Sequence, residues 1–187
     1  MTKPTTPEPE FHRPLHVEKV GLGTVHESLQ ARPTERAALA KRFGLLELSR
    51  LQAELEIEQT HGGKMLAVTG SFSADVVQQC VVTLEPLENR VENHIDALFA
   101  PQSFLERGAG PPNTEAGEED DPEPYVNGQI DLGELVAQHL GLALDPYPRK
   151  PGVAPLQKEF TGPANGNSPK ANPFAVLKSL KDKEKDS

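Results

Sequence analysis

The sequence has little cysteine, few aromatic residues and no long apolar run, and each shortage excludes a class of protein. Cys80 is the single cysteine among 187 residues, so one chain cannot form an intramolecular disulfide or a multi-cysteine metal site. Aromatic residues make up 5%, and no segment approaches the roughly 20 apolar residues needed to cross a bilayer. The N-terminus also has no apolar run of signal-peptide length. These shortages predict a cytoplasmic protein with a modest core and no membrane contact.

Basic residues are scarce over the middle of the chain. The formal net charge is −9, and between residues 80 and 146 the 14 acidic residues are accompanied only by Arg90 and Arg107. Affinity for nucleic acid normally comes from Lys and Arg that neutralise phosphates, so a free-standing RNA- or DNA-binding domain is disfavoured. Residues 149–187 have the opposite balance, with eight basic and four acidic residues.

Proline, glycine and charge divide the chain into segments. Residues 1–10 are predicted to be disordered, residues 11–148 to form a single domain, and residues 149–187 to be a flexible basic tail. Residues 101–124, rich in Pro, Gly and acidic groups, are predicted to be a solvated acidic loop inside the domain. The tail contains a short amphipathic segment, residues 172–181, which would either dock on its own domain or fold onto a partner.

Two segments carry helix signals. Residues 31–44 have Thr34 as the predicted N-cap and Gly44 as a left-handed C-cap. The second helix begins at Asp131, which is predicted to form a capping box with Glu134, and it ends before Pro146.

Between these helices every second residue is apolar, which is typical of strands. Leu51 to Ile57 alternate with polar residues, and the alternation resumes from Leu66 to Val76 after a turn, which predicts an antiparallel hairpin. Residues 91–99 predict a third strand, and residues 11–25 and 125–126 predict short ones. The fold class is therefore α+β: an antiparallel β meander or partly closed barrel with two main helices, disordered tails and an acidic loop.

No motif for catalysis or cofactor binding is present. The six histidines show no metal-ligand spacing, and neither a phosphate-binding glycine loop nor a nucleophile elbow occurs. Cys80 lies among valines and is predicted to be a buried, inert thiol on a strand. The consecutive carboxylates lack the spacing with which calcium loops wrap their ion; they are Glu118, Glu119, Asp120 and Asp121. We expect no catalytic residue, metal or cofactor.

Two motifs together resemble the YceD family, the large-ribosomal-RNA accumulation proteins of bacteria and plastids. The run Cys80-Val-Val-Thr-Leu84-Glu85-Pro86 is similar to the family's C-x-x-C-L-x-P stretch, and Ile130-Asp131-Leu132-Gly133-Glu134-Leu135 is similar to its I/V-D-L-x-E-L helix start. The resemblance covers about residues 51–148, and segments 31–44 and 172–181 look like the proteobacterial branch. Thr83 stands where the family has a second cysteine and is predicted to occupy an ordinary strand position.

The resemblance implies a non-enzymatic cytoplasmic factor that supports synthesis, processing or stability of large-subunit (23S) ribosomal RNA. Because an acidic body suits a basic ribosomal or ribosome-assembly protein, we expect protein contacts, with indirect effects on RNA. The candidate contact residues are Glu118, Glu119, Asp120, Asp121, Phe174, Leu177 and Leu180. The alternative is direct RNA binding through the basic tail, and an enzyme of unknown class is a third hypothesis. Neither DNA nor a membrane is an expected partner.

Overall fold

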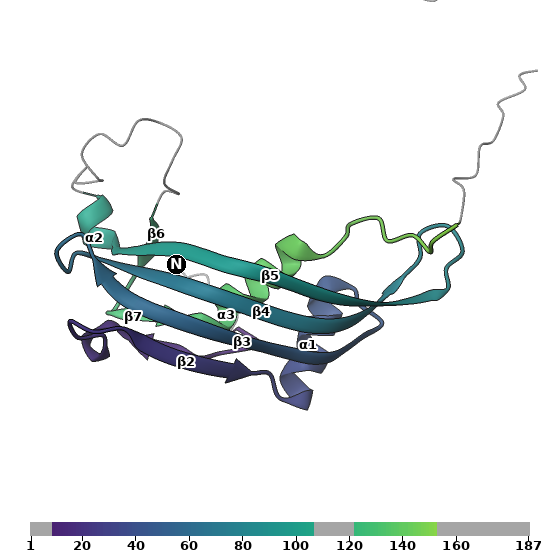
Figure 1. The fold of residues 1–187 in the computed structure, drawn as a ribbon, viewed down its shortest axis with the longest axis horizontal. Helices are drawn as coiled ribbons and strands as arrows, with labels where there is room; N and C mark the ends of the chain where they lie inside the picture. Colours follow the sequence, from purple (N-terminus) through teal and green to yellow (C-terminus); the bar gives the residue numbers. More distant parts are fainter. Residues whose placement is uncertain (1–8, 107–121, 153–187) are drawn as a thin grey trace, which may run out of the picture. The chain divides into compact units, whose positions relative to one another are not determined.

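A sheet in the order β2-β3-β4-β5-β6 is the framework of the computed structural model, which describes residues 9–106 and 122–152 (Figure 1). The strands are β1 (Pro14–His16), β2 (Val25–Gln30), β3 (Glu47–Thr60), β4 (Met65–Gln79), β5 (Pro86–Pro101), β6 (Glu123–Tyr125) and β7 (Gln129–Asp131). The helices are α1 (Pro33–Phe43), α2 (Gln102–Leu105) and α3 (Leu132–Ala143), with one 3-10 turn, η1, at Val17–Lys19.

The central strands confirm the predicted antiparallel meander. β3 pairs with β4 from Glu47↔Val77 to Thr60↔Met65, and β4 pairs with β5 from Leu66↔Phe99 to Gln79↔Pro86. The sheet is not closed into a barrel, because β2 and the parallel strand β6 lie at opposite ends of the strand order. The α+β class is therefore confirmed, in the meander form.

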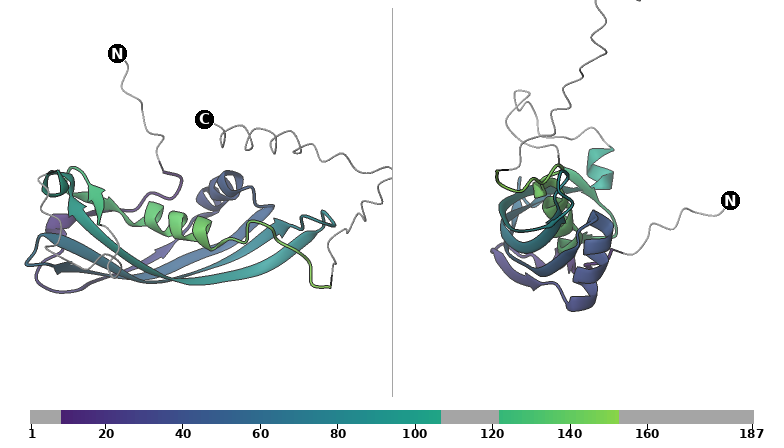
Figure 2. Two further views of the ribbon diagram at one scale, coloured as in Figure 1. Left: turned by 90° about the horizontal axis from the view of Figure 1, so that it is seen from above. Right: turned by 90° about the vertical axis from the view of Figure 1, so that its right-hand side faces the viewer.

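The two long helices lie on one side of this sheet, and the sheet curves around them (Figure 2). Alternation of apolar and polar residues places the apolar side chains of β3, β4 and β5 beneath the helices. Burial of each large apolar side chain stabilises the fold by about 1.5–3 kcal/mol. The fully buried residues at the centre include Phe11, Leu39, Leu51, Ile57, Val68 and Leu140. The core thus occupies one face of the sheet and leaves the other face to solvent.

Two of the predicted helix caps differ from the structure. The prediction that Thr34 caps α1 is wrong: the helix begins at Pro33 with Arg32 as its N-cap, because the Arg32 backbone N–H donates to Glu35 Oε2 (2.7 Å) and proline suits the first helical position. Gly44 does adopt the left-handed conformation (φ 66°) as expected. Asp131 caps α3, but Glu134 does not complete a capping box, because its carboxylate binds Arg42 instead.

The described chain reaches past both predicted ends of the domain. Glu10 Oε2 accepts from Arg42 Nη1 (3.1 Å), and Lys150 contacts the turn that follows β4. The start and end of the segment predicted to be an acidic loop form α2 and β6, and its centre lies outside the described residues. In the described part of the chain, no helix has the length and apolarity to cross a membrane.

Candidate functional site

The first family motif forms a tight turn between β4 and β5. Cys80 N–H donates to the Glu85 carbonyl (2.9 Å), and Leu84 N–H donates to the Cys80 carbonyl (2.9 Å). Leu84 has a positive φ of 61° and is 65% exposed, so the turn, not packing, fixes its backbone. The prediction that Cys80 and Thr83 lie on a strand is therefore wrong, because the reversal begins directly after Gln79.

The segment that follows α3 is bound to this turn. Val81 N–H donates to the Pro148 carbonyl (2.9 Å), and Lys150 Nζ donates to Glu85 Oε2 (2.9 Å), which lowers the pKa of Glu85. Gln78 is buried and donates from Nε2 to the Asp145 carbonyl (2.9 Å). The turn is thus hydrogen-bonded to the segment that follows α3, which lies about 70 residues later in the sequence.

Cys80 is fully buried, as predicted, and its sulfur accepts hydrogen bonds from nearby backbone N–H groups. The Thr83 hydroxyl and the backbone N–H groups of Thr83 and Lys150 lower the pKa of Cys80 to about 6. Thr83 thus supplies hydrogen bonds to the Cys80 sulfur. In the described residues, no group of three or more His, Cys, Asp or Glu side chains could hold a metal ion.

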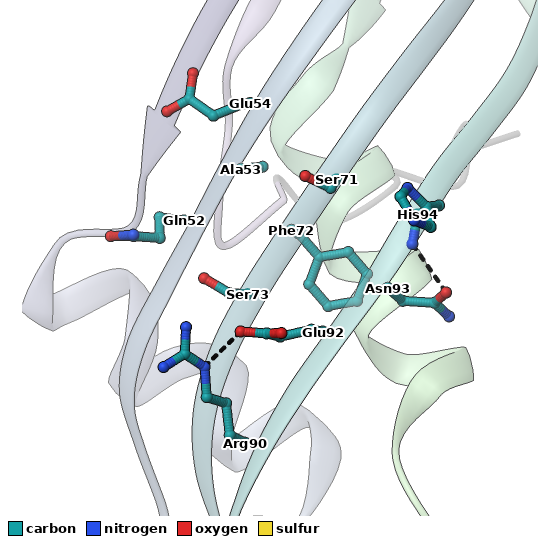
Figure 3. A pocket seen from close by; sticks show the side chains of 10 residues that line it. All are labelled: Gln52, Ala53, Glu54, Ser71, Phe72, Ser73, Arg90, Glu92, Asn93 and His94. Carbon is teal, nitrogen blue, oxygen red and sulfur yellow. Dashed lines mark hydrogen bonds and ion pairs between the residues drawn. The ribbon is translucent and has the colours of Figure 1, made fainter.

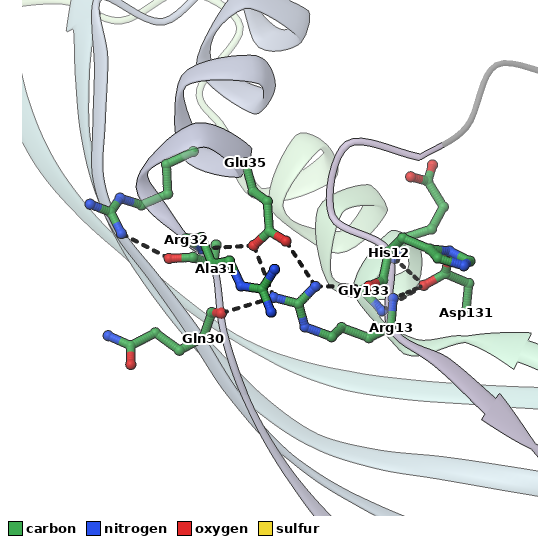
Figure 4. A network of polar contacts seen from close by, with 10 residues as sticks. His12, Arg13, Gln30, Ala31, Arg32, Glu35, Asp131 and Gly133 are labelled. Atoms are coloured by element: carbon green, nitrogen blue, oxygen red, sulfur yellow. Dashed lines mark hydrogen bonds and ion pairs between the residues drawn. The ribbon is translucent and has the colours of Figure 1, made fainter.

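The second motif fastens the start of α3 to the N-terminal segment (Figure 4). Asp131 Oδ1 accepts from the backbone N–H groups of Arg13 (2.8 Å), Gly133 (3.1 Å) and Glu134 (3.2 Å). Gly133 is needed here because a Cβ at this position would overlap the Phe11 carbonyl oxygen. One carboxylate therefore caps the helix and holds a second chain segment.

Two arginines extend this network to α1. The Arg13 guanidinium donates to both oxygens of Glu35 (2.9 Å each), and the hydrogen bond from Arg13 is the main reason that the pKa of Glu35 is lowered. Arg42 donates in the same bidentate way to Glu134 (2.9 and 2.8 Å), which raises the pKa of Arg42. Such paired geometry favours a fixed orientation of both partners.

The motif residues are thus accounted for by folding. Ile130 and Leu132 are buried, Asp131 and Glu134 hold α3, and Cys80 with Glu85 anchors the segment after it. Pro86 begins β5. These motif residues hold α3 and the turn between β4 and β5 in place.

We name the solvent-facing side of the sheet the outer face. Strand register places three rows of side chains across it: His26–Glu56–Thr69–Asp96, Ser28–Glu54–Ser71–His94 and Gln52–Ser73–Glu92. Its acidic residues are Glu47, Glu54, Glu56, Glu58, Asp75, Glu88, Glu92 and Asp96. Its arginines are Arg50 and Arg90. The outer face is therefore strongly acidic.

The cations and His26 pair with only some of these acids. Arg50 pairs with Asp75, which lowers the pKa of Asp75, and Arg90 pairs with Glu92 (2.6 Å). His26 lies 3.4 Å from Glu56. Within residues 9–106 and 122–152, the acids without an ion pair on this face are Glu47, Glu54, Glu58, Glu88 and Asp96. These carboxylates give the outer face a negative electrostatic field.

Shallow hollows lie along this face beside β5. One, of about 440 Å³, is lined by Ser71, Ser73, Arg90, Glu92 and His94 among others (Figure 3). A second, of about 660 Å³, shares His94 with it and reaches Asp96, and a third, of about 450 Å³, shares Arg90 and reaches Glu88. Hollows of this kind are open to solvent and do not enclose a small ligand.

The structure does not describe the contact residues predicted from the sequence. Glu118, Glu119, Asp120, Asp121, Phe174, Leu177 and Leu180 all lie outside the described residues, so their contact role stays a prediction. The sequence reasoning missed the outer face, although one signal was available. Glu54, Glu56 and Glu58 all occupy the polar positions of a predicted strand in which apolar and polar residues alternate. The pairing of β3 with β4, and of β4 with β5, brings Glu92 and Asp96 to the same side of the sheet.

Comparison with known proteins agrees with the two motifs. A family model described as "Large ribosomal RNA subunit accumulation protein YceD" matches residues 68–181, which is more than half of the chain and includes both motifs. No curated protein and no solved structure matches the chain. With the turn at Cys80 and the cap at Asp131 both inside the matched range, the chain belongs to the YceD family of large ribosomal RNA subunit accumulation proteins.

Proposed function

We propose that this protein is a non-enzymatic factor that supports synthesis, processing or stability of 23S ribosomal RNA by binding a ribosomal or ribosome-assembly protein. The family description supplies the role in large-subunit RNA accumulation. The observation that carries the proposed mode of action is the acidity of the outer face, where five carboxylates have no cationic partner in the described chain. Phosphates are repelled by such a surface, whereas a basic protein is steered toward it.

Ribosomal proteins that bind RNA need Lys and Arg to neutralise phosphates, so an acidic binder can cover the same cations before assembly. Binding of this kind requires no chemistry at Cys80 or at the Asp131 network. It requires only a stable sheet, and α3, which packs on the inner side of that sheet, is anchored at both ends. The cytoplasm, where ribosomes assemble, remains the expected location.

Co-purification from lysate tests the proposal. The intact chain is compared with a chain ending at Gly152, which retains the Lys150 contacts, and with a variant whose outer-face acids Glu54, Glu58, Glu88 and Asp96 are changed to their amides. We expect the intact and shortened chains to recover basic ribosomal or assembly proteins before and after ribonuclease treatment. We expect the amide variant to lose them. Equal recovery by the amide variant, or recovery of neither class of protein, would contradict the proposal.

A second candidate function is direct RNA binding by the basic segment. The family match continues to residue 181, well inside the segment 149–187 with its eight basic and four acidic residues. This function predicts binding to large-subunit RNA that weakens steeply with salt and disappears in the chain ending at Gly152. Unchanged RNA binding by the shortened chain would exclude it.

A further inference from the structure

In the part of the chain that the structure describes, residues 86–98 of β5 form a free sheet edge. Among the described residues, only β6 pairs with β5 on the side away from β4, and this pairing is limited to Phe99, Ala100 and Pro101. From Pro86 to Leu98 no described strand lies on that side, although β4 pairs along the whole of this length on the other. Such an edge presents a row of backbone N–H and C=O groups that can pair with another chain.

One backbone group shows which residues face the edge. His94 N–H donates to Asn93 Oδ1 (2.8 Å), a local bond within the same strand (Figure 3). Successive residues of a strand direct their backbone groups to alternate neighbours, so those of Glu92 and Asp96 face the same way as those of His94. The side chains of these three residues are exposed on the outer face.

We infer that the free edge of β5 binds an extended, Lys- or Arg-rich protein segment as an added strand. The inference rests on the proposed function, in that the partner is a basic protein, and it names the place and form of the contact. In β-strand addition the main chain supplies the affinity and alternate side chains supply the specificity. Here the alternate side chains along the edge include Glu88, Glu92 and Asp96, beside the hollows of the outer face.

The negative charge along the β5 edge favours a Lys- or Arg-rich segment over a second copy of this chain. Two β5 edges paired antiparallel about Glu92 would place Glu92 opposite Glu92 and Glu88 opposite Asp96. Like charges opposite each other destabilise a strand pair. Glu88 and Asp96 have no ion pair among the described residues, so basic side chains on the added strand can pair with them directly. RNA is disfavoured by the same field.

The test uses a fluorescent twelve-residue peptide of alternating Lys and Val, with binding followed by anisotropy. The full chain is compared with E88Q/E92Q/D96N on β5 and with E54Q/E56Q/E58Q, which removes the same number of charges from β3 on the same face. We expect the β5 variant to weaken binding about tenfold, about 1.4 kcal/mol, and the β3 variant to weaken it less than threefold. Equal weakening by both variants would overturn the inference, because it would indicate binding to the face as a whole.

The main-chain contact has its own controls. A peptide N-methylated at every second residue keeps its charge but cannot complete the strand pairing, and we expect it to bind at least tenfold more weakly. We also expect the unmodified peptide to protect the Glu92 and Asp96 amides from hydrogen exchange. Equal binding of the methylated peptide, or no protection on β5, would overturn the inference.

Other occupants give different results. Peptide binding only after truncation at Gly152 would show that the chain's own tail fills the edge, and displacement of the peptide by a twelve-nucleotide single-stranded RNA would assign the edge to RNA; either result overturns the inference. Recovery of ribosomal proteins from lysate by E88Q/E92Q/D96N at the level of the unaltered chain would also overturn it, while leaving the proposed function intact.

Discussion

Replacement of Asp131 by alanine tests how the second family motif holds the fold. Asp131 Oδ1 accepts three backbone N–H groups, two at the start of α3 and one from Arg13. Loss of an N-cap costs about 0.5–2 kcal/mol. Leaving the half-buried Arg13 N–H without its acceptor costs about 1–3 kcal/mol, with the lower part of that range expected because water can reach the site. We therefore expect D131A to lower the free energy of unfolding by about 2–3 kcal/mol.

The assay is urea unfolding at pH 7, with Asp131→Asn as the matched control. An amide oxygen can occupy the position of Oδ1 and accept the same three N–H groups, so D131N should lose less than about 1 kcal/mol. The amide also removes the negative charge that Asp131 Oδ2 presents to His12 Nδ1. A D131A value within about 0.5 kcal/mol of the unaltered chain, or equal losses for the two variants, would refute the reasoning, since surface substitutions commonly fall in that range.

Three further predictions concern the other parts of the framework. Gly133→Ala should lower stability by about 1–3 kcal/mol, because its Cβ would overlap the Phe11 carbonyl; a rise in melting temperature would contradict this. Hydrogen bonding from Arg13 lowers the pKa of Glu35 below its ordinary 4.5, so this carboxylate stabilises the fold above that pH and the contribution is lost as pH falls through the lowered value. E35Q should therefore lose less stability than the unaltered chain between pH 7 and pH 3, and an equal loss would count against the pair. Thiolate absorbance of the folded chain, with C80S as blank, should titrate near pH 6, and stability due to the Cys80 thiolate should fall between pH 9 and pH 6; a midpoint above 8 would disagree.

The parts of the fold that could be predicted are those where apolar residues recur at the regular spacing of a strand or a helix. Alternation from Leu51 to Ile57 and from Leu66 to Val76 predicts the hairpin and its buried face, and both are present. The helix cap at Asp131 is also a local signal, since it involves residues two and three positions away.

The failures come from contacts between distant residues. Valines after Cys80 have strand propensity, but the chain already reverses there, and the backbone N–H of Lys150, 70 residues away, donates to the Cys80 sulfur within the turn. Glu134 has the spacing of a capping box, yet the bidentate ion pair with Arg42 determines its orientation. The outer face required the register of several strands at once, so single-strand patterns showed its glutamates without showing that they share one surface.

Site-specific photo-crosslinking in living cells tests the central claim most directly. A photoreactive residue is placed at Ser73 on the outer face, and for comparison at Gln138, which is exposed on α3 on the other side of the sheet. The account predicts crosslinks from Ser73 to a basic ribosomal or ribosome-assembly protein, and far fewer from Gln138. Crosslinks from Ser73 to ribosomal RNA alone, or the same proteins captured equally from both positions, would contradict it.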